Sequence, residues 1–402
     1  MSIDVTQSPY NADNTGATDC TSAFQAASNA AQAMPTGAEI VFPAGKYMVS
    51  GQVNWGQSSG AKAVRHVGEG QQVTQIHMQG QANCWNVGQY ATFGDINGDE
   101  GTFQMEGMGF YNDVSASSFT ATNIAIYLSG VNHGRISDVG VYKGPTAQKV
   151  NQAIVMNGCS QVIVDSCDLW SVVNSVTYEG YCQVCTVRDS HLWTSSGSGA
   201  SNTAALLYKG QTLGCAARHV ICHDGDRGVL ATQDSNGQTP HLFEFLDVET
   251  NNHTIAHFDF QYGVHATLLQ CILSGAAVDL NVPGVNFGLN WQGEVTVSAS
   301  QLIGVPGHGM VIKAGSGYLI EGCKWGGSGS YKAANNTYDE LNCASGASQV
   351  SVRGNHFNTD TLLGVGTSMV PRWGINSAAS SFSQTDNYFA SSSLYGTGQH
   401  TP

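Results

Sequence analysis

A short alternation of apolar and polar residues recurs at a fixed distance along this chain. Residues 164–170 read VDSCDLW, and residues 187–193, which begin 23 positions later, read VRDSHLW. Leu302 and Trp325, which anchor two similar segments, are separated by the same distance in the sequence. A period of about 20 to 30 residues with strands in each unit is typical of solenoid proteins. Because such a unit is too short for a pair of helices, the repeat predicts an all-β parallel β-helix whose equivalent residues stack about 4.8 Å apart.

The repeat separates positions that hold the fold from positions that are free to vary. Val164 and Val187 match because both side chains are expected to point inward, into one apolar column. Asp165 and Arg188 differ because outward positions carry no such constraint, so we expect function to reside on outward positions. The same alternation, closed by polar or glycine turns, marks residues 134–142, 161–170, 185–193, 241–249, 267–275, 295–304, 317–325 and 349–357.

The composition supports a turn-rich β protein and argues against several classes of partner. Only 11% of the 402 residues are charged, 49 are glycine, and the net charge is −14. A nucleic-acid partner would require a basic surface, and an acidic chain also disfavours binding to anionic membranes. No run of 18 apolar residues occurs, so no membrane insertion is predicted. Residues 1–5 lack the features of a signal peptide, so we expect either no export by that route or a signal that has been removed.

The chain has 11 cysteines, an odd number, so at least one cannot form a disulfide within the chain. Cys182 and Cys185 have the spacing of a redox or zinc motif, but no second pair accompanies them. Cys159 and Cys182 are one period apart, which places them in equivalent positions of adjacent repeats. We therefore expect the thiols to be reduced and buried as small apolar side chains.

One convincing helix is predicted, over residues 18–34. Thr18 or Asp19 is expected to cap its N-terminus, and Pro35 follows its end. The first coil of a solenoid has an open core, so we expect this helix to cover it. The chain then divides into a lead-in with the capping helix at 1–50, the β-helix at 51–360, and a C-terminal cap or oligomer contact at 361–402. The apolar stripe of the helix is formed by Cys20, Phe24, Ala27 and Ala31.

The N-terminal segment resembles a known family. Residues 10–51, with an Asn-Ala-Asp lead, an Ala-rich helix and a Phe-Pro-x-Gly-x-Tyr turn, are followed by Gly-x-Gly-x-x-x-Thr-x-Ile at 68–76. These motifs are similar to those of the pectate-lyase-like superfamily. Within it, the chain most resembles bacteriophage tailspike depolymerases, on its acidic charge, its unpaired thiols and its short terminal segments. The resemblance implies a single-stranded right-handed parallel β-helix. It also implies a homotrimer in the virion, acting outside the cell, that cuts bacterial surface polysaccharide; it does not specify the activity.

Hydrolysis of a glycosidic bond requires two carboxyl groups, and outward carboxylates one coil apart would supply them. Asp224 and Asp247 are one period apart in the sequence, as are Asp226 and Glu249. If these residues are in register, four carboxylates form a patch whose crowding raises a pKa, as a general acid requires. Arg227 is then placed to orient the substrate. The alternative is a polar turn with a chance spacing.

A second candidate site combines Asp165 and Asp168 with Asp189 and His191 of the next coil. Asp165 and Asp168 differ by an odd number of residues, so a flat strand would direct them to opposite faces. The site therefore requires a bend between them.

Other residues are weaker candidates. His253, His257 and Asp259 have a metal-like spacing that converges only on a helix, so no metal site is predicted there. His253 remains a candidate for substrate binding or, in a lyase, for the base. Gly307-His308-Gly309 resembles a motif of polygalacturonase-like hydrolases, but its paired aspartates are missing upstream, so a turn is predicted.

The aromatic residues fall into two groups. Tyr262, Trp291 and Trp373 lie outside the repeat anchors and are predicted to be exposed platforms for sugar rings. The repeat-anchor tryptophans are predicted to fill core or corner positions instead; they are Trp170, Trp193 and Trp325.

Three functions remain open. The first is an endo-acting glycoside hydrolase without a cofactor. The second is a lyase that breaks uronate polymers, for which the carboxylates of residues 224–249 could hold calcium. The third is a glycan-binding adhesin without activity.

Overall fold

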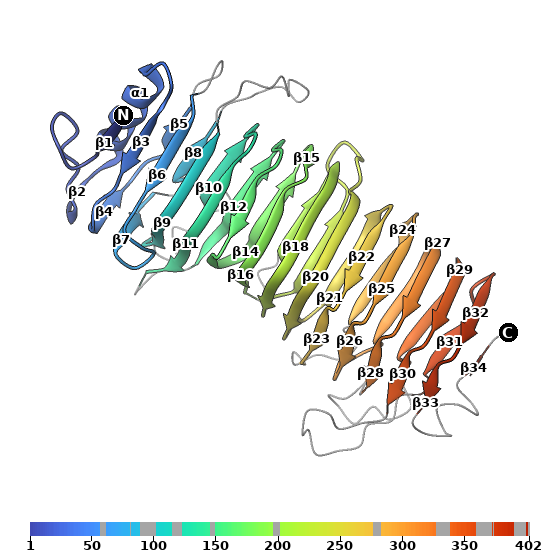
Figure 1. Cartoon of the computed structure of the whole chain (residues 1–402). Helices are drawn as coiled ribbons and strands as arrows, with labels where there is room; N and C mark the ends of the chain where they lie inside the picture. Colours follow the sequence, from blue (N-terminus) through green and yellow to red (C-terminus); the bar gives the residue numbers. More distant parts are fainter. Residues whose placement is uncertain are drawn as a thin grey trace. The chain divides into compact units, whose positions relative to one another are not determined.

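A computed structural model describes most of the chain as two compact units, Met1–Thr194 (unit 1) and Ser195–Pro402 (unit 2). The described residues are all except 57–61, 81, 89–101, 115–122, 145–148, 196–201, 276–282, 327–337, 359–371, 373, 390–398 and 401–402. Within each unit, short strands pair in parallel with strands of neighbouring coils (Figure 1). Each unit is a parallel β-helix, right-handed as parallel crossovers require, so the predicted fold class is confirmed.

The elements of unit 1 are α1 (Thr21–Ala33), β1 (Ser2–Asp4), β2 (Thr15–Asp19), β3 (Ala38–Val41), β4 (Gly45–Val49), β5 (Val53–Trp55), β6 (Val64–Val67), β7 (Thr74–Met78), β8 (Trp85–Val87), β9 (Phe103–Asn112), β10 (Ile124–Ser129), β11 (Arg135–Lys143), β12 (Val150–Asn157), β13 (Ile163–Asp165), β14 (Asp168–Glu179), β15 (Cys182–Gln183) and β16 (Thr186–Trp193).

The elements of unit 2 are β17 (Ala204–Lys209), β18 (Thr212–His223), β19 (Arg227–Thr232), β20 (His241–Asn251), β21 (Ala256–Gly263), β22 (Ala266–Leu269), β23 (Ile272–Ser274), β24 (Val285–Trp291), β25 (Val295–Ser298), β26 (Gln301–Ile303), β27 (Met310–Glu321), β28 (Lys324–Gly326), β29 (Leu341–Arg353), β30 (His356–Asn358), β31 (Ile375–Ser377), β32 (Phe382–Thr385), β33 (Tyr388–Phe389) and β34 (Gln399–His400).

The sequence repeat in unit 1 is a register of stacked coils. Val164 pairs with Val187, and Leu169 pairs with Leu192. All four side chains are fully buried, so the predicted inward column is confirmed. Leu302 likewise pairs with Trp325 in unit 2.

Each coil bends at a residue whose backbone lies in the left-handed region. Ser166 has φ of 54° and Asp189 has φ of 49° in unit 1, and Asp247 has φ of 51° in unit 2. Aspartate tolerates this conformation better than bulky residues do. Because Ser166 separates β13 from β14, Asp165 and Asp168 face outward on two adjacent faces while Val164 and Leu169 both stay inside. The bend that the second candidate site requires is therefore present.

The helix α1 begins three residues later than predicted. Cys20 occupies the N-cap position without a side-chain cap hydrogen bond, so the predicted capping by Thr18 or Asp19 is wrong. Asp19 instead accepts the backbone N–H of Thr21 from outside the helix and also binds Ser50. As predicted, the helix lies over the core of the first coils: the Phe24 ring is 5.2 Å from Phe42 and 5.6 Å from Trp85. At 13 residues, the sole helix of the described residues is too short to span a bilayer.

The thiols are buried and form no disulfides. All eleven cysteines lie within the described residues, and none is bonded to another. Burial raises the pKa of Cys167 and of Cys271 to about 12, so both stay protonated at neutral pH. The prediction of reduced, core-filling cysteines is confirmed, and the spacing of Cys182 and Cys185 reflects strand geometry.

Fully buried histidines predict a loss of stability in acid. Burial lowers the pKa of His66 to about 3 and of His257 to about 4. Below pH 6.5 the unfolded chain binds protons that the folded chain does not, so stability is full above pH 6.5 and falls as the pH decreases. The free energy of unfolding, measured with urea, should fall between pH 7.5 and pH 5 in both proteins. The fall should be smaller for His257→Gln than for the wild type, by about 2 kcal/mol. An equal decrease in both proteins would contradict this, and the exposed His133→Gln serves as control.

Candidate functional site

The four carboxylates predicted as the first-choice site do not lie in register. Strands β18 and β20 pair with an offset longer than the predicted period, so that Glu249 faces Ile221 and Asn251 faces His223. The predicted period fails here because the connection at 233–240, between β19 and β20, lengthens this coil. Neither predicted pair, Asp224 with Asp247 or Asp226 with Glu249, is formed by strand pairing.

Each of these carboxylates has its own local structure. Asp247 is an exposed corner residue with φ of 51°, and Asp224 has φ of 57° in the turn after β18. Glu249 accepts a hydrogen bond from the Asn251 side chain at 2.9 Å. Asp226 is 7% exposed and accepts a hydrogen bond from the Thr254 hydroxyl at 2.9 Å. Strand pairing does not bring these four carboxylates together, and the calcium site considered for a lyase stays a prediction.

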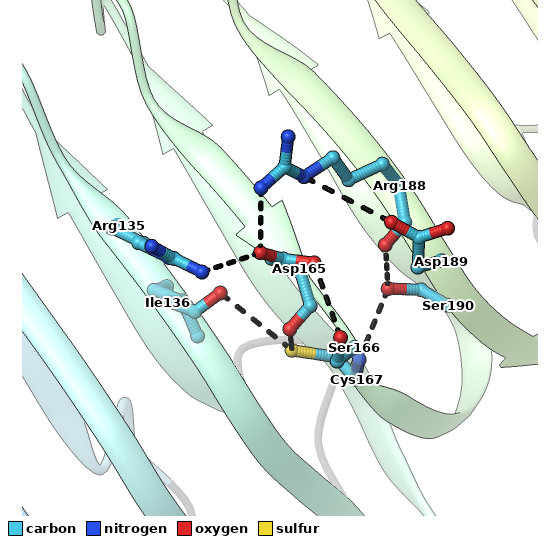
Figure 2. A network of polar contacts seen from close by, with 8 residues as sticks. All are labelled: Arg135, Ile136, Asp165, Ser166, Cys167, Arg188, Asp189 and Ser190. Atoms are coloured by element: carbon cyan, nitrogen blue, oxygen red, sulfur yellow. Dashed lines mark hydrogen bonds and ion pairs between the residues drawn. The ribbon is translucent and has the colours of Figure 1, made fainter.

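The second-choice residue Asp165 joins three coils of unit 1 (Figure 2). One oxygen, Oδ2, accepts hydrogen bonds from Arg135 at 2.7 Å and from Arg188 at 2.8 Å. The hydrogen bond from Arg188, with a further one from Ser166, holds the pKa of the Asp165 carboxyl below its usual value. This carboxylate is therefore ionised at neutral pH, and its contacts are those of a cross-coil ion pair.

The other two second-choice aspartates lie on separate surfaces. Asp168 accepts a hydrogen bond from the indole N–H of Trp170 at 2.8 Å. Asp189 is an exposed corner residue, 4.0 Å from Nε of Arg188. Asp168 pairs in register with His191, as the sequence period predicts.

The predicted substrate-binding residues divide into buried and exposed ones. His253 is fully buried and Trp291 is 1% exposed, so both predictions of surface contacts are wrong. His253 packs against His257 inside the coil, and the register bulge between β21 and β24 turns Trp291 inward. Tyr262 is partly exposed, as predicted. Trp373 lies outside the described residues.

The repeat-anchor tryptophans also include buried and partly exposed side chains. Trp325 is in the core, as predicted, at 1% exposure. Trp170 and Trp193 pair in register and are both partly exposed on the outside, so the predicted core position is wrong for them.

Unit 2 contains a pocket, lined by both polar and apolar side chains, that the sequence did not predict as a whole. Its volume is about 400 Å³, and successive coils contribute to it through β21, β24, β27 and β29. Residues of one outward column pair in register across these coils: Asp259 with Asn286, Asn286 with Val311, and Val311 with Asn342. The pocket is lined by Ile255, Ala256, Asp259, Pro283, Asn286, His308, Val311, Lys313 and Asn342.

Asp259 is the carboxylate at one end of this pocket. Its Oδ2 accepts hydrogen bonds from Nε of Arg227 at 2.7 Å and from the Gln261 amide at 2.9 Å. Its Oδ1 accepts a hydrogen bond from the Asn286 amide at 2.7 Å. Three donors, one of them a guanidinium, hold this carboxylate in a fixed orientation. Arg227, predicted to orient substrate, thus orients Asp259.

His308 lies at the other end of the pocket. The backbone N–H of Asp339 donates to its Nδ1 at 2.9 Å, so the neutral ring carries its proton on Nε2. Nε2 is 3.5 Å from the Asn342 side-chain amide, which also lines the pocket. Burial lowers the pKa of His308 and the Asp339 charge opposes this, so the ring is neutral at neutral pH.

An ion pair between the buried Asp339 and the partly exposed Arg372 holds the residue that donates to His308. The Asp339 carboxylate is fully buried and accepts two hydrogen bonds from Arg372, at 2.9 and 2.7 Å. Asn376 donates a third at 3.0 Å. The sequence predicted only a turn at His308, because Asp339 and Arg372 are distant in the chain and belong to no repeat.

The pocket therefore presents one carboxylate, one neutral imidazole N–H and the Lys313 side chain beside the apolar surface of Ile255 and Val311. Among the described residues no group of three or more His, Cys, Asp or Glu side chains could hold a metal ion. His253 and Asp259 of the metal-like spacing point to the interior and to the pocket respectively.

The pair of Arg227 and Asp259 should be strongly coupled in stability. Their side chains are 9% and 5% exposed, and removal of one partner leaves a buried charge. We expect Arg227→Met to lower the free energy of unfolding by about 3–5 kcal/mol. The exposed pair of Arg353 and Glu321 is the control, and Arg353→Met should cost less than about 1 kcal/mol.

Urea denaturation of both single variants and of the double variant Arg227→Met/Asp259→Asn provides the measurement. The double variant should recover part of the loss, since no buried charge then lacks its partner. Equal losses in the free energy of unfolding for Arg227→Met and Arg353→Met would contradict the prediction. They would show that the pair of Arg227 and Asp259 is no more important for stability than an exposed pair.

Several solved structures have a fold similar to that of this chain. Gene product 12 of bacteriophage phi29, in its pre-mature form, is 12% identical with a TM-score of 0.60, covering 98% of this chain and 58% of that one. Tailspike protein 3 of bacteriophage CBA120 is 12% identical with a TM-score of 0.60, covering 98% and 60%. PfbA, a surface adhesin of Streptococcus pneumoniae, is 11% identical with a TM-score of 0.55, covering 97% and 91%. The chain thus spans less than two thirds of these two phage proteins.

Sequence comparison is more specific. No curated protein matches the chain significantly. The family model of rhamnogalacturonase A/epimerase, pectate lyase-like, matches residues 5–256, which is more than half of the chain. This chain belongs to the rhamnogalacturonase A/epimerase, pectate lyase-like family.

Proposed function

We propose that this chain is a depolymerase that hydrolyses glycosidic bonds of a bacterial surface polysaccharide in the pocket of unit 2. The observation that carries the proposal is the Asp259 carboxylate, held by three donors at the edge of the pocket. The family name combines a polysaccharide hydrolase with an epimerase, and one of the similar structures is a phage tailspike. Both support a glycan as the substrate.

Asp259 would act on the sugar in its ionised form. Hydrolysis needs one ionised carboxylate, which activates water or attacks the sugar, and one carboxylic acid, which protonates the leaving oxygen. The Arg227 contact suits Asp259 to the first role. We assign the second role to Asp226, whose backbone oxygen accepts the N–H groups of Ile255 and Ala256 in the pocket wall.

The remaining lining residues would position the sugar. The Nε2–H of neutral His308 can donate a hydrogen bond to a hydroxyl or ring oxygen. Asn286 and Asn342 offer further amide groups, although Asn286 already binds Asp259. The apolar side chains of Ile255 and Val311 suit the C–H face of a sugar ring.

A lyase is the second candidate, and Lys313 favours it. Abstraction of a proton beside a uronate carboxylate requires a cation near that carboxylate, and Lys313 lines the same pocket as His308. The Nε2–H tautomer of His308 is a donor and not a base, so this structure favours hydrolysis.

We also propose the biological setting that the sequence resemblance implies. The chain would form a homotrimer in a phage tail and act on the host surface. The similar folds of two phage proteins support this setting. Mass measurement in solution tests it: a trimer is expected, and a monomer at all concentrations would contradict it.

The catalytic proposal predicts that Asp259→Asn lowers kcat/KM on the cognate polysaccharide at least 100-fold. The amide cannot activate water, and it keeps the volume and part of the hydrogen bonding of the carboxylate. Asp226→Asn should give a similar loss, whereas the exposed corner variant Asp247→Asn should keep full activity. Release of reducing ends is measured across a panel of bacterial capsules and O-antigens, at a temperature at which each variant is shown to be folded, because Asp259→Asn weakens the buried pair with Arg227 and lowers stability.

Three outcomes would contradict the proposal in different ways. Full activity of folded Asp259→Asn would show that the pocket carboxylate has no catalytic role. Loss of activity in Asp247→Asn or Glu249→Gln would show that the active site contains the carboxylates that the sequence predicted. Products that absorb near 235 nm would identify a lyase.

A further inference from the structure

Unit 1 carries a line of aromatic side chains on its outer surface, one from each of five strands. We call it the aromatic strip; its members are His77 (β7), Tyr111 (β9), Tyr142 (β11), Trp170 (β14) and Trp193 (β16). His77 pairs in register with Tyr111, Tyr111 with Tyr142, and Trp170 with Trp193. At about 4.8 Å per coil, four steps extend the strip over roughly 19 Å.

Neighbouring rings of the strip are in contact, and one pair meets edge to face: the Tyr142 and Trp170 centroids are 6.3 Å apart at an interplanar angle of 63°. The centroids of His77 and Tyr111 are 5.1 Å apart at an interplanar angle of 10°, and those of Trp170 and Trp193 are 5.3 Å apart at 33°. Parallel rings at such a separation are offset, so each ring covers its neighbour only in part. His77 is 6% exposed, whereas the other members are partly exposed.

Glycines allow two of these rings to lie against the sheet. A Cβ atom at Gly140 would lie 2.2 Å from the Tyr142 ring, and one at Gly109 would lie 2.9 Å from the Tyr111 ring. Each ring therefore folds back over the glycine two positions before it. A tyrosine that lies over its own strand presents more of its ring face than one that projects straight from the sheet.

Fixed polar groups line the edge of the strip. The indole N–H of Trp170 donates to Asp168 at 2.8 Å, and Nδ1 of His77 is 2.8 Å from Asp113. The Tyr142 hydroxyl donates to Gln71 at 2.7 Å, and Gln71 donates to Asp138 at 2.8 Å. The strip thus combines apolar ring surface with three held carboxylates, which are acceptors for hydroxyl groups.

We propose that the aromatic strip is a binding surface for an uncharged, hydroxyl-rich polysaccharide chain that lies along unit 1. A sugar ring has an apolar C–H face, which fits an aromatic surface, and a rim of hydroxyl donors, which fits carboxylates. Charge decides the class of glycan: the carboxylates of Asp113, Asp138 and Asp168 would repel a polyanion, and they outnumber the two lysines near the strip, Lys143 beside Tyr142 and Lys149 at 5.6 Å from the centre of the Trp170 ring. This surface belongs to unit 1, whereas the pocket belongs to unit 2.

The test is affinity electrophoresis of the full chain in gels that contain dextran, mannan or galactan, with polygalacturonate as the anionic polymer. The chain carries Asp259→Asn throughout, so that cleavage does not interfere. We expect at least one neutral polymer, and not polygalacturonate, to retard the protein. Tyr142→Ala/Trp170→Ala should weaken this binding at least 10-fold at an unchanged melting temperature.

Tyr388→Ala is the matched control, because Tyr388 is also exposed and lies 5.4 Å from a histidine ring, but belongs to unit 2. It should leave binding unchanged. If Tyr142→Ala/Trp170→Ala fails to fold, a fluorescence measurement replaces it. The bound polymer should protect tryptophan fluorescence of the Asp259→Asn chain from quenching by acrylamide. Trp170→Phe/Trp193→Phe should abolish this protection.

Binding to none of the neutral polymers would overturn the proposal, as would retardation by polygalacturonate alone. Self-association that disappears in Tyr142→Ala/Trp170→Ala would identify the strip as a contact between copies of the chain instead. Because binding is measured without turnover, it can persist when the catalytic proposal fails, and the reverse also holds.

Discussion

The left-handed residue at the corner of each coil determines which side chains reach the surface. At Ser166 and Asp189 the chain turns from one parallel sheet face to the next. This turn lets Val164 and Leu169 both stay buried, while Asp168 is partly exposed and Asp165 is covered and bound by Arg135 and Arg188. The same corner occurs in unit 2 at Asp247, which explains an aspartate there by conformation and not by chemistry.

The sequence predicted the fold because inward residues are constrained in every coil. Val164 and Val187 repeat, since each must fill the same column. The candidate site could not be predicted in the same way, because its outward residues need not repeat. A fixed period also fails wherever a connection changes length. At 233–240 the longer connection shifts the register, so that Glu249 faces Ile221 and the predicted carboxylate pairs are lost.

Few residues of this chain are charged. The carboxylates at the pocket of unit 2 and behind it are held in ion pairs. Asp259 is bound by Arg227, and Asp339 is bound by Arg372. Both pairs join different coils and lie far apart in sequence, so no local motif reveals them. Such pairs cost desolvation energy and fix the orientation of the groups that they hold. At this site they fix a carboxylate at one end of the pocket and a histidine tautomer at the other.

The most direct test of this account is a crystal structure of Asp259→Asn with an oligosaccharide of its cognate polysaccharide. The account predicts a sugar ring in the pocket of unit 2, within hydrogen-bonding distance of Nε2 of His308 and in contact with Val311. A scissile sugar bound over Asp247 and Glu249, with the pocket empty, would contradict it.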